Sequence, residues 1–256
     1  AKFADDYAEM KARKNNGEMV MSIGKKKKFK RASVEYKASG AKAIFYRQLL
    51  EYKKEKWFIF SYMTLFCIGA DILFLKVIDV SEFGSKSAVL LGIVAYLAIL
   101  TGGYLGKWDK ELKNPYLFLL PDSPAKKMWY ATVMEHVKAA IDGAILVLPL
   151  GIAWKVHPFH IVSCWLIYVF LQAIKLYTKV LIDSFLRNSL GETVKQLVRL
   201  GVQGGIIGIG VLLAVVAVVL QNFNFAFFVI LIYGMIMAVV IGLLTVSRFA
   251  IMEQYD

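Results

Sequence analysis

The stretch LGVQGGIIGIGVLLAVVAVVL, residues 200–220, decides the fold class of this 256-residue chain. It contains no charged residue, and it is as long as the roughly 20 apolar residues that a membrane-spanning helix needs. The composition agrees, because 58% of the residues are hydrophobic and the mean hydropathy is +0.57. The sequence therefore predicts a membrane protein.

Five more apolar runs of similar length occur along the chain. Together they predict an all-α membrane protein with six transmembrane helices, which places both termini on one side. The six expected spans are residues 57–75, 88–104, 128–154, 159–177, 200–220 and 225–246.

The residues before the first run are polar and basic, and hold 16 of the 31 Lys and Arg residues. We expect residues 1–41 to form a basic cytosolic linker, in which the cluster from Lys25 to Arg31 either contacts anionic lipids or is simply solvated. Residues 42–56 show apolar and basic positions at helical spacing, typical of an amphipathic interfacial helix. The transmembrane domain then covers residues 57–250, and residues 251–256 form a cytosolic tail.

Basic residues predict the orientation of the spans. Only Lys76, Lys86 and Lys155 fall on the side opposite the N-terminus, so the positive-inside rule places the N-terminus and the C-terminus in the cytosol.

The sequence lacks the motifs of several kinds of chemistry. The two Gly-Lys pairs lack the other residues of a phosphate-binding loop, and no HExxH motif occurs. His157 and His160 have no nearby carboxylate to complete a zinc site. We therefore expect no catalytic residue, no metal, no cofactor and no nucleic-acid partner.

Charged residues inside the expected third span form the most unusual intramembrane feature. Glu135, Lys138 and Asp142 are spaced three and four apart, so they share one helical face and can pair. They either line a translocation path or act as an ion-pair staple between helices, and we favour the staple. Asp71 in the first span, which can reach Lys76 or a polar group on another helix, poses the same choice.

The connection between the second and third spans contains ELKNPYLFLLPDSPAKK, residues 111–127. Its apolar centre, bounded by prolines, is too short to span a membrane and too apolar for a solvated loop. It must bury its apolar side against lipid or in a groove on a partner protein.

This segment and the order of elements around it resemble the putative ABC exporter family of bacterial membrane proteins, which is related to type-2 ATP-binding-cassette permeases. The chain resembles the second six-span half of such a protein. The resemblance implies that the segment forms a cytosolic coupling helix docking on an ATPase subunit, with Lys126 and Lys127 at its return to the membrane. Residues 189–200, whose Ser-x-x-Glu opening fits a capping box, would give a second cytosolic contact. The residues that would shape the coupling element are Pro115, Tyr116, Phe118, Leu119, Leu120, Pro121 and Pro124.

We therefore expect a permease subunit, or half, of an ATP-binding-cassette exporter in the bacterial cytoplasmic membrane. Its partners would be a separate ATPase subunit and a second six-span half, from the same parent chain or a homodimer. The alternatives are an ion- or proton-coupled secondary transporter using Asp71 and Glu135, and a membrane scaffold protein. A membrane-embedded enzyme is disfavoured because no nucleophile-base pair appears at helical spacing.

Overall fold

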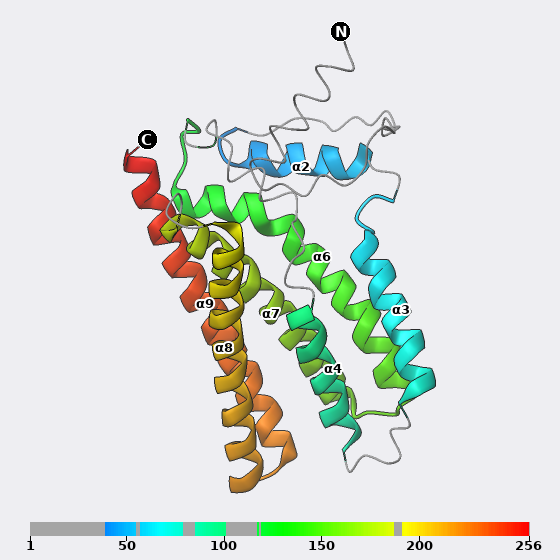
Figure 1. Cartoon of the computed structure of the whole chain (residues 1–256). Helices are drawn as coiled ribbons and strands as arrows, with labels where there is room; N and C mark the ends of the chain where they lie inside the picture. The colour runs from blue at the N-terminus through cyan, green and yellow to red at the C-terminus, as the bar shows by residue number, and fades with distance from the viewer. Residues whose placement is uncertain are drawn as a thin grey trace.

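A computed structural model describes residues 39–54, 57–78, 85–100, 117, 119–186 and 191–255. This part of the chain is all-helical, as the sequence predicts, and contains no strand (Figure 1). Its helices, in chain order, are α2 (Lys42–Lys54), α3 (Tyr62–Val77), α4 (Lys86–Leu100), α6 (Pro124–Ala153), α7 (Pro158–Phe185), α8 (Glu192–Leu220) and α9 (Phe223–Tyr255).

Four of the helices, α6 to α9, are long and apolar enough to cross a membrane. α4 is apolar but has 15 residues, and α3 has 16. At 1.5 Å per residue these two helices extend about 24 Å or less, against a hydrocarbon core of about 30 Å. The last four expected spans thus correspond to helices of sufficient length, while six complete spans remain a prediction.

The first expected span begins later than the sequence suggests, because a capping box fixes the start of α3. The Ser61 side chain accepts a hydrogen bond from the Met63 N–H, and the Thr64 side chain accepts one from the Ser61 N–H. Residues 57–59 form a turn before this cap. By contrast, α8 begins after Gly191, which makes no side-chain cap, and Ser189, where the sequence suggests a capping box, lies outside the described residues.

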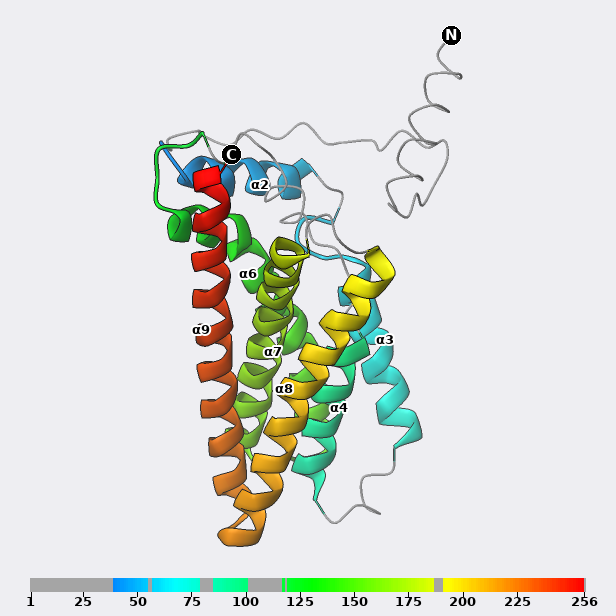
Figure 2. The same ribbon diagram turned by 60° about the vertical axis from the view of Figure 1, so that its left-hand side comes forward.

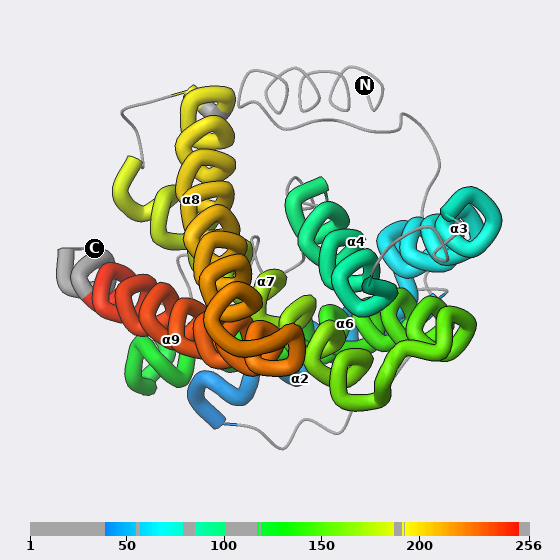
Figure 3. Tube along the Cα trace, turned by 90° about the horizontal axis from the view of Figure 1, so that it is seen from below, coloured from blue at the N-terminus to red at the C-terminus, as the bar shows by residue number. Residues whose placement is uncertain are grey.

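The long helix α7 lies at the centre of the bundle (Figure 3). It contacts α4, α6, α8 and α9, while α3 packs on α6. α2 lies along the first turns of α6, close to the end of α9, at what we call the α2 end of the molecule (Figures 1 and 2). The opposite end, where α6 turns into α7 and α8 into α9, is called the far end.

The largest core cluster joins α3, α4, α6, α7 and α9. Gly143 allows α6 to approach α7 closely there, because a Cβ atom at this position would lie 2.6 Å from Cδ1 of Tyr168. Leu146, Val147 and Leu150 continue the buried side of α6 toward the far end and are fully buried. The interior of the bundle is therefore built on α6 and α7.

Candidate functional site

The helix α2 is fixed to α6 by two hydrogen bonds with the same sequence separation. Gln48 Nε2 donates to the Ala131 carbonyl at 2.8 Å, and Tyr52 Oη donates to Glu135 Oε1 at 3.0 Å, each across 83 residues. The constant separation means that α2 and α6 run parallel over this stretch. Because Gln48 and Tyr52 are four residues apart, as are Ala131 and Glu135, one turn of each helix faces one turn of the other.

The start of α2 is held to the segment just before α6. Asp122 Oδ2 accepts a hydrogen bond from the Ala41 N–H at 2.8 Å. Gly40 makes this approach possible, because its φ of +64° is in the left-handed region and a Cβ there would lie 2.3 Å from Asp122 Oδ2. The Ala41 N–H, followed by the charge of Lys126, holds the pKa of Asp122 below its ordinary value.

These three contacts, made by Ala41, Gln48 and Tyr52 with Asp122, Ala131 and Glu135, are called the α2–α6 contact below. Beneath them Ala41 and Ile44 pack in a buried cluster with Leu117, Met128 and Ala131. Phe249 of α9 completes that cluster. The contact and the buried cluster together join α2, α6, α9 and Leu117 at the α2 end.

The predicted coupling element falls partly outside the described residues, since Pro115, Tyr116 and Phe118 are not among them. Of its remaining residues, Leu119 is 77% exposed, Leu120 packs against the buried cluster and Pro124 opens α6. The Leu120 N–H donates to the Leu117 carbonyl, and the Asp122 N–H donates to the Leu120 carbonyl across Pro121. Residues 119–123 are thus a turn that leads into α6, and the coupling helix remains a prediction.

The return of the chain to the bundle places two lysines differently. Lys126 is exposed and pairs with Asp122 at 3.4 Å, whereas Lys127 is 1% exposed.

Two of the three charged residues on one face of α6 accept hydrogen bonds from other helices. Glu135 accepts from Tyr52 of α2, and Asp142 Oδ1 accepts from Thr64 Oγ1 of α3 at 2.6 Å. Lys138 is buried and lies within electrostatic reach of Asp142. The two hydrogen bonds join α2 and α3 to α6, and the ion-pair staple stays a prediction.

Asp71 differs from these residues. It is 5% exposed, and its Oδ1 atom has no hydrogen-bond partner among the described residues. The expected contact with Lys76 or with a polar group on another helix is therefore not made by this oxygen.

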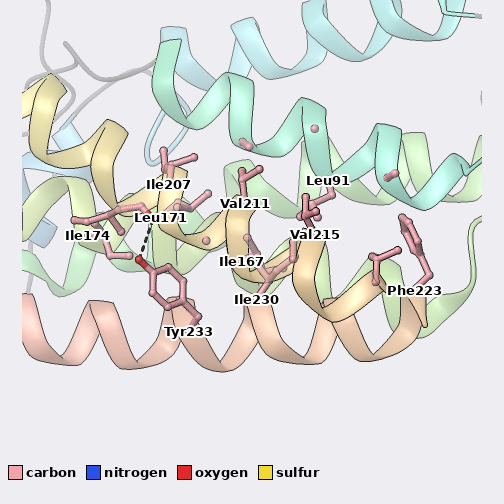
Figure 4. A pocket seen from close by; sticks show the side chains of 18 of the residues that line it. Leu91, Ile167, Leu171, Ile174, Ile207, Val211, Val215, Phe223, Ile230 and Tyr233 are labelled. Atoms are coloured by element: carbon pink, nitrogen blue, oxygen red, sulfur yellow. Dashed lines mark hydrogen bonds between the residues drawn. The ribbon is translucent and has the colours of Figure 1, made fainter. Parts of the chain in front are cut away.

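An apolar groove of about 400 Å³ lies between α4 and α8 (Figure 4). α7 contributes Ile167, Leu171 and Ile174 to its wall, and α9 contributes Ile230 and Tyr233. The Tyr233 hydroxyl donates to the Ile206 carbonyl at 2.9 Å, so the one phenol in the wall is already paired within the chain. Leu91, Ile207, Val211, Val215 and Phe223 complete the labelled lining, and the groove contains no charged side chain.

A second surface feature of α8 is a run of glycines on a different face of the helix. Gly201, Gly204, Gly205 and Gly208 follow the spacing of one helical face, and nothing lies within 4 Å of a Cβ built at any of them. Only Gly210, at the edge of the groove, meets another helix, through Tyr233. The four open glycines are called the glycine face below.

At the far end, His160 joins three helices. Its Nδ1 is 2.8 Å from Ser87 Oγ of α4, and its Nε2 is 2.8 Å from Asn224 Oδ1 of α9. The ring stacks on Phe227 with centroids 4.4 Å apart. The described residues contain no group of three or more His, Cys, Asp or Glu side chains that could hold a metal ion.

Sequence reasoning missed four residues of these contacts: Gln48, Tyr52, Thr64 and Asp122. A usable signal existed only for the first two, because Ile44, Gln48 and Tyr52 share one face of the amphipathic helix. Thr64 and Asp122 act across about 80 residues, and no local pattern identifies such partners.

Comparison with known proteins identifies the family of the chain. No curated protein and no solved structure matches it. Its sequence matches the family described as "Putative ABC exporter" over residues 1–253. Because this match covers nearly the whole chain and agrees with the apolar helices, the chain belongs to the putative ABC exporter family and is a membrane component of a transporter.

Proposed function

We propose that this chain is the permease half of an ATP-driven exporter, and that a separate ATPase subunit supplies the energy. The family implies an ATPase partner in general. In this proposal the chain itself is not catalytic: it contributes the transport path and the contact through which ATPase movement reaches the helices.

The α2–α6 contact is the observation that carries the proposal. Its residue Asp122 follows the expected docking residues Tyr116 and Phe118 closely in the sequence. Leu117, between those two, is buried against α2, α6 and α9. A partner that moves this segment would therefore move Leu117 and Asp122. Through them it would act on three helices, two of which continue as long membrane helices.

We further propose that the apolar groove, rather than the charged face of α6, contributes to the transport path. Glu135 and Asp142 accept hydrogen bonds from α2 and α3, so binding a substrate through them would require breaking these hydrogen bonds. The side chains that line the groove are uncharged and come from four different helices, so small helix movements would change its width. A cargo with an apolar body fits such a wall best.

The second six-span half is expected to pack on the glycine face. Small residues at this spacing allow the backbones of membrane helices to approach closely, and no described residue lies against these four. The expected cytosolic location of the α2 end and both termini remains part of the same proposal.

The docking step is tested by co-expressing the full chain with the ATPase subunit that the proposal expects to be encoded beside it. The double variant Tyr116→Ala, Phe118→Ala should lose most of the co-purified ATPase, because two aromatic anchors are removed. Phe228→Ala is the matched control, since this aromatic is exposed on α9 and should leave the association unchanged. Undiminished ATPase association in the double variant would contradict the docking assignment.

The secondary-transporter alternative is decided by the same preparation. Transport by the reconstituted chain in the absence of any ATPase and of ATP would favour that alternative and contradict the ATP-driven proposal.

A further inference from the structure

Asp71 is an acidic side chain placed among apolar neighbours. It lies on α3 beside Cys67 and Ala70, two members of the largest core cluster, in which α6 contributes Leu146, Val147 and Leu150. Only 5% of Asp71 is exposed, and its Oδ1 has no hydrogen-bond partner among the described residues. An ionised carboxylate would here leave an oxygen with negative charge and no donor.

Asp142 provides the contrast on the neighbouring helix. It is equally buried, but Thr64 donates to it at 2.6 Å and Lys138 lies within electrostatic reach. Thr64 precedes Asp71 by seven residues on α3, so Asp71 lies about 10 Å farther from the α2 end. Thr64 and Lys138 therefore serve Asp142, while Asp71 Oδ1 has no donor among the described residues.

Cys67, one helical turn before Asp71 on α3, is a titratable group with which Asp71 interacts electrostatically. Cys67 is also within electrostatic reach of Lys138 and Asp142 on α6 and within hydrogen-bonding reach of Tyr168 on α7. Buried acids without a cation or donors become neutral rather than remain charged, and carboxyls inside membranes often mark proton relays.

We propose that Asp71 is an intramembrane proton-binding site. In the described conformation one oxygen of the carboxyl carries the proton. When α3 moves away from α6, water reaches the carboxyl, the O–H bond breaks, the proton passes to water and a solvated carboxylate remains. Thr64, Cys67 and Asp71 follow one another on one face of α3, so separation at the Thr64–Asp142 contact opens the way to Asp71 from the α2 end. The site does not depend on ATPase docking.

Infrared spectroscopy of the full chain in lipid vesicles tests the protonation. At neutral pH the wild type should show a protonated-carboxyl C=O band that Asp71→Asn removes and Asp142→Asn retains. Asp71→Glu, which keeps the acid group but moves it, should keep a band at a shifted frequency. Absence of a band that depends on residue 71 would overturn the proposal, as would its disappearance when sodium replaces choline at constant pH, which indicates a cation site.

The release step is tested by following the shift of this band after transfer to D₂O. Exchange should be slow in the wild type and several-fold faster in Thr64→Val, because this variant loses the hydrogen bond that joins α3 to Asp142. Tyr62→Phe is the control, since Tyr62 is exposed on the same helix and should exchange like the wild type. Equal exchange in Thr64→Val and wild type would overturn release through separation of α3 from α6.

Discussion

The helices α6 and α7 differ from α8 and α9 in how much of their apolar stretch the chain itself covers. In α6 and α7 this buried share is 44% and 50%, whereas in α8 and α9 it is 22% and 17%. The two pairs have similar lengths, so length does not cause the difference. α6 and α7 form the interior of the bundle, and α8 and α9 turn most of their surface outward.

The two pairs of helices also differ in the polar residues that they contain. The covered helices can carry polar groups such as Asp142, His136 and Ser163, because neighbouring helices enclose or bond them. Within their apolar stretches, residues 200–220 and 225–246, the outward helices carry no charged residue, as expected for surfaces that face lipid or another membrane helix. High hydropathy therefore marks the outside of this membrane protein and does not identify its core.

Replacing glycines on the two kinds of helix should give the largest difference in stability between them. In α6, Gly143→Val should destabilise the fold by roughly 1–3 kcal/mol, because its side chain would overlap the Tyr168 ring. In α8, a Val side chain at Gly205 meets no described residue, so Gly205→Val should leave the melting temperature of the chain without its second half, in detergent, unchanged or slightly higher. Equal losses of melting temperature in both variants would show that α8 is covered as α6 is.

Hydropathy predicted the long helices well but placed their ends inside the true ends. The run at residues 200–220 belongs to a helix that starts at Glu192, and the run at residues 225–246 belongs to one that continues to Tyr255. These helices persist where the sequence turns polar, because backbone hydrogen bonds continue beyond the apolar part. An apolar window therefore finds the membrane segment of a helix and not its length.

The charged face of α6 shows why the candidate site was harder to predict. Spacing alone suggested that Glu135 and Asp142 pair with Lys138 on the same helix. The structure gives Glu135 the hydroxyl of Tyr52 and Asp142 that of Thr64, each about 80 residues away. Helical periodicity determines which residues share a face, but it contains no information about which helix packs there.

A substitution at the contact between α2 and the covered helix α6 should have a smaller effect on stability. Tyr52→Phe removes the donor to Glu135 and should lower the free energy of unfolding by about 1 kcal/mol, the usual net value of one hydrogen bond. Hydrogen–deuterium exchange in α2 should become faster, because the second turn of its contact with α6 is lost. Tyr62→Phe, at a tyrosine that is 87% exposed, is the control. Unchanged α2 exchange in Tyr52→Phe would mean that the bond does not hold α2 in place.

The smallest expected effect is the pH dependence of the Asp122 contact at the start of α6. The pKa of Asp122 is lowered in the folded chain, so the ionised form stabilises the fold above the ordinary value of 3.8. This stabilisation is lost as the pH falls through the lower, folded-state pKa. The melting temperature of wild type should therefore exceed that of Asp122→Ala at pH 6, and the difference should shrink below about pH 4.

The two partners of Asp122 can be separated by a second variant. The Ala41 N–H is the largest single cause of the lowered pKa, whereas the side chain of Lys126 is 66% exposed and its ion pair is screened by solvent. Lys126→Ala should therefore keep most of the pH-dependent difference. If Lys126→Ala abolished it, the exposed ion pair, and not the contact with the start of α2, would hold the carboxylate. The α2–α6 contact would then begin at Gln48, and movement of the segment before α6 would reach α2 only through the buried cluster around Leu117.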